Sequence, residues 1–261
     1  MAVNINEARL VMISKFPSLL NSRRQTPNTP SNLTRTKPTD NPLAYHTTMS
    51  NQTDILFEDA DLLALNKPSG LLTEGGGERE DDLEQIATRL SGKTVRCCHR
   101  LDRLTSGVVL LRKTARFNAE LAALFESHRM RKLYWAVVEG AWPAKIAKVE
   151  TQIAAVSPGR FANVATGGKS AVSTFRVLGR SPDNQRTWLS VILKTGRTHQ
   201  VRLHCAHVGC PIVGDPVYGR GAADFFGLHA RELRFCHPGT GQEINLVAPQ
   251  PNNWPEWCRE M

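Results

Sequence analysis

Short apolar runs separated by polar turns fill the chain from residue 55 onward. The runs at residues 55–57 and 62–65 flank an acidic turn, a pattern that predicts a β-hairpin. Residues 108–111 are four apolar residues in succession, which predicts a buried strand. Further strands are predicted at residues 133–138, at residues 188–193 and, more weakly, at residues 246–247.

Two segments have helical spacing. Residues 82–90 repeat apolar side chains at intervals of three and four, and residues 115–130 place Leu121, Leu124 and Phe125 on one side of an amphipathic helix. Strands and helices alternate without the regular βαβ period of a doubly wound sheet. The pattern therefore predicts an α+β fold with a mixed or mainly antiparallel sheet.

Residues 1–50 are rich in Asn, Thr, Ser and Pro and have no pattern that would bury enough apolar surface to offset the entropy of ordering. We expect a disordered tail, or an over-extended gene model whose true start is Met49. The basic, acid-poor segment around residues 11–20 leaves a transit peptide as the alternative. The expected organisation is this tail followed by one folded domain at residues 51–261.

The net charge of +9 makes a polyanion the first class of partner to consider. About half of the excess belongs to residues 1–48, which hold six basic and two acidic residues. No stretch approaches the roughly 18 apolar residues of a membrane helix. These features predict a soluble protein with no membrane partner.

The six cysteines have no regular spacing, which is typical of reduced thiols in a cytoplasmic protein. A zinc site is the alternative, because Cys and His gather at residues 97–99 and 204–207. However, no Cys-x-x-Cys pair exists, and adjacent cysteines rarely bind one tetrahedral ion together. We therefore expect no metal.

The first segment with candidate chemistry is residues 99–107, immediately before the predicted strand 108–111. Its Thr, Ser and Gly favour a tight turn, so Asp102 is predicted on a loop at the sheet edge, a favoured place for catalytic groups. Arg100 and Arg103 flank it. A surface loop with ion pairs worth about 0–1 kcal/mol explains the same residues equally well.

The second segment is residues 131–140, where alternation puts Tyr134, Ala136 and Val138 on one face of a strand. The small Ala136 beside Tyr134 leaves space for a planar base to stack on the ring. A half-buried core tyrosine is the simpler alternative.

The third segment, residues 194–209, predicts a helix with Thr198 as N-cap and Gly209 as the C′ residue. His199 and Arg202 are three residues apart and share one face. The buried stripe is expected at Val201, Cys205 and Val208. Most polar groups of this segment can equally serve to satisfy neighbouring backbone.

Together these segments closely resemble the RluA-type family of RNA pseudouridine synthases. The matching sequence motifs are HRLDRLTSGVVLL, RKLYWAVVEG and LKTGRTHQVRLHCAHVGCPIVGDPVYG. The resemblance covers roughly residues 52–257. Two departures matter. Residues 1–50 are too short and polar to supply the extra RNA-binding domain of many relatives. After Leu72 the chain reads Thr-Glu-Gly-Gly-Gly where a Val-His-Pro type of sequence is common, so that side of the cleft differs.

The resemblance implies the pseudouridine synthase core, a long mixed and mainly antiparallel sheet with flanking helices and a central catalytic cleft, formed by residues 51–261. It implies an isomerase that detaches uracil from C1′ of a uridine in RNA, rotates it and rejoins it through C5. That reaction involves no net redox change or hydrolysis, so no cofactor is expected. The implied partner is structured RNA, either ribosomal or transfer RNA, and we expect a cytoplasmic monomer.

The resemblance also implies roles for individual residues. Asp102 matches the catalytic aspartate, acting as nucleophile or as base, and Arg202 matches the residue that pairs with it and favours its ionised form. Tyr134 matches the residue that stacks under uracil and takes the C5 proton. The implied substrate-binding residues are Arg100, Arg103, Thr105, Arg197, His199 and Gln200.

Two other classes of function remain as alternatives. One is a non-catalytic RNA-binding protein with the same fold, which would have no reason to keep Asp102, Tyr134 and Arg202 together. The other is a metal-dependent hydrolase, for which the sequence lacks a ligand set.

Overall fold

The computed structural model describes residues 53–78 and 80–259. The tail predicted at residues 1–50 lies outside the described residues. The strands are β1 (Ile55–Glu58), β2 (Leu62–Lys67), β3 (Arg96–Cys97), β4 (Ser106–Arg112), β5 (Arg131–Glu139), β6 (Lys148–Ser157), β7 (Arg160–Val164), β8 (Lys169–Arg180), β9 (Arg186–Leu193), β10 (Leu228–Cys236) and β11 (Glu243–Val247). The helices are α1 (Leu83–Ser91), α2 (Asn118–Glu126), α3 (Gln200–His207) and a short 3-10 turn, η1 (Glu256–Cys258).

The strands form one 11-stranded sheet in the order β1-β2-β4-β10-β5-β9-β8-β6-β7, with β11 beside β10 and β3 beside β4. All described pairings are antiparallel except β4 with β10, where Ser106 lies opposite His229 and Gly107 opposite Ala230. Gly107 has φ +113°, and a Cβ there would collide with the Ala230 carbonyl, so this close approach requires glycine. The predicted α+β fold with a mixed, mainly antiparallel sheet is confirmed.

The predicted strands are all present, and each is longer than its apolar run. The β1–β2 hairpin is confirmed, as are β4, β5, β9 and β11. The sequence pattern did not predict β3, β6, β7, β8 or β10. In β6 only Val149 and Ile153 are buried, and the apolar run at residues 153–156 was not recognised as a strand. In β10 the buried polar residue His229 lies between apolar ones, so that strand has no continuous apolar run.

Two of the three predicted helices need correction. Helix α1 begins where expected, at an Asp82 N-cap whose Oδ1 accepts from the Gln85 amide at 2.8 Å. Helix α2 is shorter than residues 115–130, because His128 adopts φ +58° and the chain then turns into β5. Helix α3 begins at Gln200 with His199 as N-cap, so the prediction of Thr198 as N-cap is wrong. Gly209 has the positive φ expected of a C′ residue.

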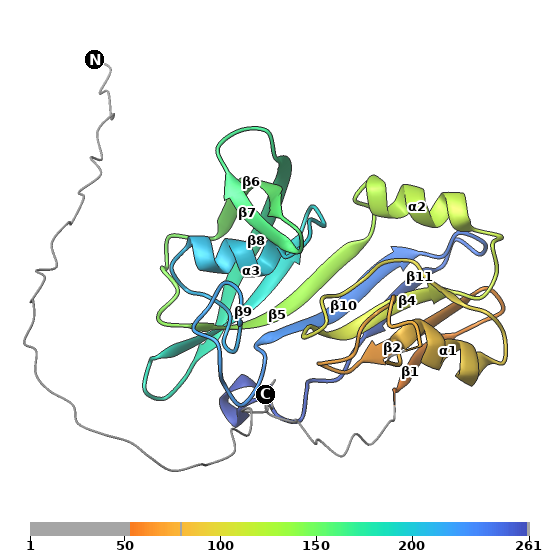
Figure 1. Cartoon of the computed structure of the whole chain (residues 1–261), viewed down its shortest axis with the longest axis horizontal. Helices are drawn as coiled ribbons and strands as arrows, with labels where there is room; N and C mark the ends of the chain where they lie inside the picture. The colour runs from red at the N-terminus through yellow and green to blue at the C-terminus, as the bar shows by residue number, and fades with distance from the viewer. Residues whose placement is uncertain (1–52, 79, 260–261) are drawn as a thin grey trace, which may run out of the picture. The chain divides into compact units, whose positions relative to one another are not determined.

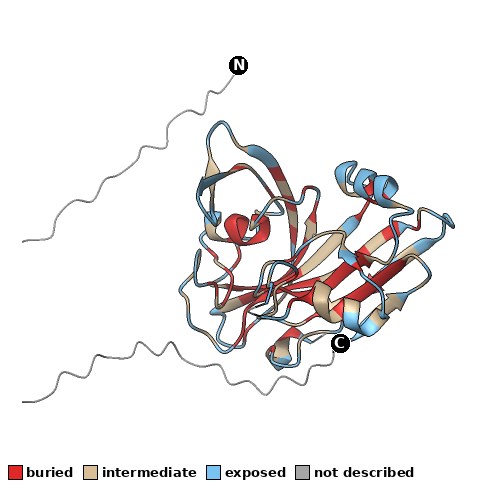
Figure 2. Cartoon of the chain, turned by 45° about the vertical axis from the view of Figure 1, so that its right-hand side comes forward, coloured by how far each residue is buried: buried red, intermediate tan, exposed pale blue. Residues whose placement is uncertain are grey.

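The helices divide between the two ends of the sheet, with β5 and β10 running between those ends (Figure 1). Helix α3 contacts β6, β7 and β8, and it is buried along almost its whole length, whereas α1 and α2 each expose one side (Figure 2). Tyr134 packs against two core clusters. One contains Ala136 and Val201, and the other Leu101 and Val109. The middle of β5 therefore lies between these two core clusters.

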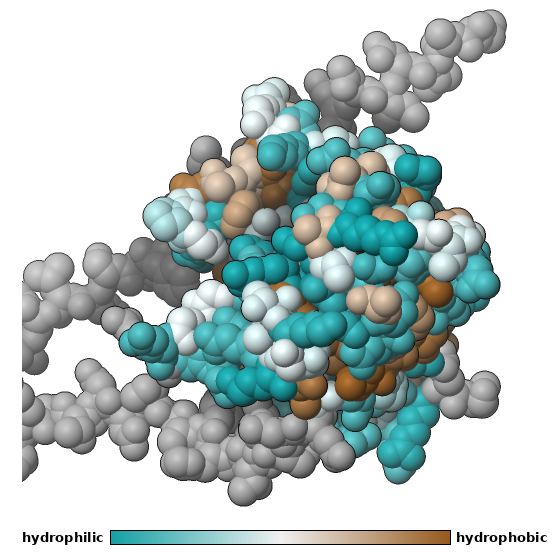
Figure 3. Space-filling model, turned by 90° about the vertical axis from the view of Figure 1, so that its right-hand side faces the viewer, coloured by the Kyte–Doolittle hydropathy of each residue, from teal (hydrophilic) through white to brown (hydrophobic). Residues whose placement is uncertain are grey.

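The surface is largely polar on the face shown in Figure 3, where apolar side chains gather only in smaller patches. Among the described residues, no helix has the length and apolar character needed to cross a membrane.

Candidate active site

A cleft of about 680 Å³ opens where the three predicted chemical segments converge. Its lining comes from the loop before β4, from β5 and from the start of α3, together with the loop after β2. All nine side chains predicted as site residues line it: Arg100, Asp102, Arg103, Thr105, Tyr134, Arg197, His199, Gln200 and Arg202. The fold therefore brings together residues up to 102 positions apart in the sequence.

Asp102 lies on the loop before β4, as predicted, and the residues on both sides of it are held. The Thr73 hydroxyl donates to the Leu101 carbonyl at 2.9 Å and accepts from the Leu101 amide at 3.1 Å. On the other side, the Lys67 ammonium donates to the Arg103 carbonyl at 2.9 Å. These contacts fix the backbone that carries the carboxylate.

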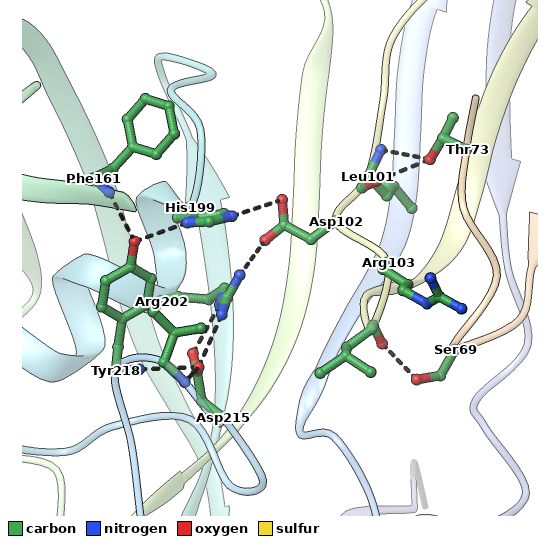
Figure 4. A network of polar contacts seen from close by, with 12 residues as sticks. Ser69, Thr73, Leu101, Asp102, Arg103, Phe161, His199, Arg202, Asp215 and Tyr218 are labelled. Carbon is green, nitrogen blue, oxygen red and sulfur yellow. Dashed lines mark hydrogen bonds and ion pairs between the residues drawn. The ribbon is translucent and has the colours of Figure 1, made fainter. Parts of the chain in front are cut away.

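Arg202 joins two carboxylates (Figure 4). Its Nη1 donates to Asp102 Oδ2 at 2.9 Å, and its Nε and Nη2 donate to the two oxygens of Asp215 at 2.7 and 2.9 Å. Asp215 Oδ1 also accepts from the amides of Val217 and Tyr218 at 2.9 and 3.1 Å. The side chain of Asp215 is 0% exposed and that of Arg202 6%, whereas that of Asp102 is 25% exposed. The predicted Asp102–Arg202 contact is present, and Asp102 is the member open to the cleft.

Asp215 completes a buried ion pair that the sequence did not predict. Burial acts to raise the pKa of Asp215, but hydrogen bonds and charge from Arg202, with the two backbone amides, outweigh burial and lower it. The planar guanidinium thus has one bidentate partner that orients it and a third N–H left for Asp102. The only sequence signal was a single carboxylate two residues after the apolar pair Ile212 and Val213.

His199 approaches the other oxygen of Asp102. Its Nε2 lies 3.7 Å from Asp102 Oδ1, beyond hydrogen-bonding distance, and its Nδ1 lies 2.8 Å from the Tyr218 hydroxyl. His199 and Arg202 both approach Asp102, although His199 is the N-cap of α3 and not a residue of its helical face as predicted. Burial lowers the pKa of His199, which favours the neutral ring at pH 7.

Tyr134 is half-buried on β5, and its neighbour Ala136 is fully buried on the same face. Burial raises the pKa of Tyr134, and the charge of Asp102 raises it further. The phenol is therefore neutral in the resting site. This surrounding suits a ring that supports a stacked base, but it does not favour ionisation of the hydroxyl.

The two arginines that flank Asp102 are exposed and paired with acids of the loop after β2. Arg100 Nη1 lies 3.4 Å from Glu74 Oε1, and Arg103 makes two contacts with Glu80 at 3.0 and 2.8 Å. This loop is the one whose sequence departs from the family pattern. Glu74 lines the cleft, so the departure places a carboxylate beside the site.

The other predicted binding residues differ in how many of their polar groups already have hydrogen-bond partners within the protein. Arg197 donates through Nε to the Ser170 carbonyl at 2.9 Å. Thr105 is buried, and its amide donates to the Asp102 carbonyl at 3.0 Å. Gln200 is buried and bonded on both ends of its amide, with partners Val172, Ser173, Thr195 and Arg197. Gln200 therefore shapes the turn before α3, and its contact with substrate stays a prediction.

Lys67 is a second residue that the sequence did not predict for the site. Its side chain is fully buried, and its ammonium donates to the carbonyls of Pro68, Leu71 and Arg103 at 3.0, 2.7 and 2.9 Å. Burial lowers its pKa to about 7, with Asp102 acting to raise it and Arg103 to lower it. From the sequence, Lys67 was predicted only as part of the turn after the strand, whereas it is the last residue of β2.

Within residues 53–78 and 80–259, no three His, Cys, Asp or Glu side chains lie close enough together to hold a metal ion. The two Cys and His clusters weighed as a zinc site therefore do not meet in one place.

Comparisons with known proteins agree with this geometry. The family model described as RNA pseudouridylate synthase matches residues 61–207. The uncharacterized RNA pseudouridine synthase YhcT of Bacillus subtilis is 33% identical over 216 residues, covering 79% of this chain and 71% of the relative. Ribosomal large subunit pseudouridine synthase D of Zymomonas mobilis is 34% identical, covering 77% of this chain and 70% of the relative.

A solved structure is similar as well. The human RNA pseudouridylate synthase domain containing 4 superimposes with a TM-score of 0.62 at 26% identity, covering 76% of this chain and 88% of that chain. The family match spans the loop before β4, β5 and α3, which all contribute to the cleft. The chain therefore belongs to the RNA pseudouridylate synthase family, the isomerases that convert uridine to pseudouridine in RNA, as its RluA-type motifs predicted.

Proposed function

We propose that this protein isomerises specific uridines in ribosomal RNA, with Asp102 as the catalytic carboxylate. The observation that carries the proposal is the position of Asp102: a partly exposed carboxylate in the cleft, 2.9 Å from a buried arginine. Several relatives are named ribosomal large subunit pseudouridine synthases, which supports ribosomal RNA as the substrate class.

The reaction needs a carboxylate that stays ionised and faces the sugar. Arg202 holds one oxygen of Asp102 by a direct hydrogen bond, and Asp215 prevents the guanidinium from turning away. Asp102 then assists cleavage of the bond between uracil N1 and C1′. Uracil N1 loses its bond to C1′ and takes up a proton, while C5 bonds to C1′ and loses its hydrogen as a proton. No electrons are gained or lost overall, so the isomerisation needs neither an oxidant nor a bound cofactor.

The detached base must be held while it rotates. Tyr134 lies on the floor of the cleft with Ala136 on its face of β5, and we assign it the role of stacking platform for uracil. A uridine paired or stacked in RNA must first be flipped out, at a cost of a few kcal/mol. Arg100, Arg103 and Arg197 line the cleft, and their contacts with phosphate would offset that cost.

The test compares Asp102→Asn with the wild type on large subunit ribosomal RNA labelled with tritium at uridine C5. Isomerisation releases this hydrogen, so tritium in solvent measures turnover. We expect Asp102→Asn to lose turnover by at least 10³-fold, an effect of the order reported for removing other catalytic groups, while RNA binding stays within about threefold because the change alters no phosphate contact. Asp183→Asn, on an exposed turn outside the cleft, is the matched control and should keep full activity.

Turnover of Asp102→Asn within tenfold of wild type would contradict the catalytic assignment. Transfer RNA labelled in the same way is assayed in parallel. Release from transfer RNA alone would contradict the ribosomal substrate and leave the isomerase activity standing.

A further inference from the structure

His199 has a fixed hydrogen-bonding partner on the side away from Asp102. Its Nδ1 lies 2.8 Å from the Tyr218 hydroxyl, and that hydroxyl oxygen also accepts from the backbone amide of Phe161 at 3.2 Å (Figure 4). The rings of Phe161 and Tyr218 meet the imidazole edge-on, each with its centroid 5.5 Å from that of His199. The imidazole is therefore held between two rings and cannot change its orientation freely.

The direction of these hydrogen bonds decides where the ring proton is. A backbone amide can only donate, so the Tyr218 oxygen is the acceptor toward Phe161. The hydroxyl then has its own hydrogen to donate, and Nδ1 of His199 is the acceptor that the described residues provide. A hydroxyl that donates to Nδ1 requires this nitrogen to be unprotonated, which puts the hydrogen of the neutral ring on Nε2.

The side facing Asp102 supports the same assignment. Nε2 lies 3.7 Å from Asp102 Oδ1, and an N–H there is attracted by the carboxylate, whereas an unprotonated nitrogen would be repelled. The charged groups around the ring are Asp102, Arg202 and Asp215. Burial lowers the pKa of His199 most strongly; Asp102 and Asp215 act to raise it and Arg202 to lower it, and the result is a lowered pKa.

We propose that Tyr218 is a positioning residue that holds His199 as the neutral tautomer protonated on Nε2 and directs this N–H at Asp102. The catalytic use of this contact rests on the proposed function of Asp102. The tautomer of His199 does not depend on that function. Asp102 then has one oxygen bound by Arg202 and the other facing His199. The residues that orient these two side chains both lie in the segment 215–218, because Asp215 binds Arg202 and Tyr218 binds His199.

The backbone at His199 shows the same constraint. His199 has φ +58°, a left-handed conformation that only a few per cent of non-glycine residues adopt, histidine more often than most. Its side chain accepts no hydrogen bond from the first-turn amides of α3, so capping does not explain this conformation. The strained residue instead places the imidazole between Tyr218 and Asp102.

The tautomer is measured by ¹⁵N NMR of the full-length protein at pH 7, with the His199 signals identified by their loss in His199→Asn. We expect Nδ1 to resonate as an unprotonated and Nε2 as a protonated ring nitrogen. Tyr218→Phe should shift both signals toward an average of the two tautomers. Thr151→Val is the matched control, because it removes a hydroxyl that lies 3.0 Å from Nε2 of another histidine on α3, His204, and should leave the His199 signals unchanged.

Activity gives the second measurement. Tyr218→Phe should lower kcat about tenfold, the effect of one lost oriented hydrogen bond near 1.4 kcal/mol, with KM for RNA unchanged within twofold. His199→Asn should lower kcat at least as much, and it should fold, since asparagine tolerates the left-handed conformation. Adding Tyr218→Phe to His199→Asn should lower kcat no further.

A wild-type His199 protonated on Nδ1, or unchanged His199 signals in Tyr218→Phe, would overturn the proposal. So would a Tyr218→Phe enzyme with wild-type kcat. The Asp102→Asn variant separates the two proposals: its activity tests the catalytic assignment, whereas its His199 tautomer should remain that of the wild type.

Discussion

The buried guanidinium of Arg202 lies between two carboxylates that differ in exposure. Asp215 is 0% exposed and has no access to solvent, whereas the side chain of Asp102 is 25% exposed. Leaving a charge unpaired lowers the free energy of unfolding, and the loss is larger when the charge is more deeply buried. The sequence alone predicted that loss of Arg202 would leave Asp102 unpaired, but in the structure the more costly unpaired charge is Asp215.

Double-mutant cycles measure this difference. Arg202→Ala should lower the free energy of unfolding by about 3–5 kcal/mol, the usual cost of breaking a buried pair. The cycle with Asp215→Ala should show strong coupling, because the double variant leaves neither buried charge unpaired. The cycle with Asp102→Ala should show weaker coupling, since water can reach Asp102. Unfolding in urea measures all five variants.

Arg202→Lys serves as the conservative control. It keeps the charge without the planar fork and should retain more stability and more activity than Arg202→Ala. A cycle between Arg202 and Asp215 that is additive within about 0.5 kcal/mol would show that the two side chains do not stabilise each other.

At the scale of elements, the segment that follows β2 supports the loop that precedes β4. Lys67 binds the Arg103 carbonyl and Thr73 binds both backbone groups of Leu101. Asp102 lies between these two anchors. Because β2 and β4 are paired strands, the support is anchored in the sheet.

Replacing Lys67 with Met tests this support. The variant keeps an unbranched chain but leaves three carbonyls without their donor, so we expect a loss of stability of about 2 kcal/mol and a lower kcat as the Asp102 loop loosens. Lys145→Met, at an exposed position, is the control and should change neither quantity.

The same variant has a defined pH dependence. The pKa of Lys67 is lowered from 10.5 to about 7 in the folded protein. Between these values the unfolded chain binds the proton and the folded protein does not, so the free energy of unfolding of the wild type rises with pH. Lys67→Met should lack this rise between pH 7 and pH 10. Parallel slopes for the two proteins would contradict the lowered pKa.

At the scale of the whole molecule, basic charge is divided between the domain and the segment before it. Residues 1–48 hold six basic and two acidic residues, and the family match begins at residue 61. We therefore propose that the segment adds electrostatic affinity and does not take part in catalysis.

A protein that starts at Met49 should keep the kcat of the full chain. Its affinity for RNA should be weaker at low salt, and the slope of log K against log salt should be shallower, because fewer phosphates are neutralised. Filter binding over a range of salt concentrations measures the slope. Complete loss of turnover in folded, truncated protein would show that residues 1–48 belong to the enzyme.

The sequence by itself determined the elements whose signals are local. Continuous or alternating apolar runs predicted β1, β2, β4, β5 and β9, and helical spacing predicted α1, because such patterns depend only on neighbouring residues. The family motifs identified nine of the residues that line the cleft, and they predicted the contact between Asp102 and Arg202.

Tertiary structure alone decided the features whose causes are distant in the chain. Strands β6, β7 and β8 lie toward one end of the sheet and have few buried positions. Polar residues interrupt the apolar positions of β10. Gln200 was predicted to bind substrate, but its amide is occupied by residues that the fold brings to it. Asp215, Tyr218 and Lys67 have roles only because their partners approach from other elements. Burial determines what a charged or polar side chain does, and burial is a property of the folded chain.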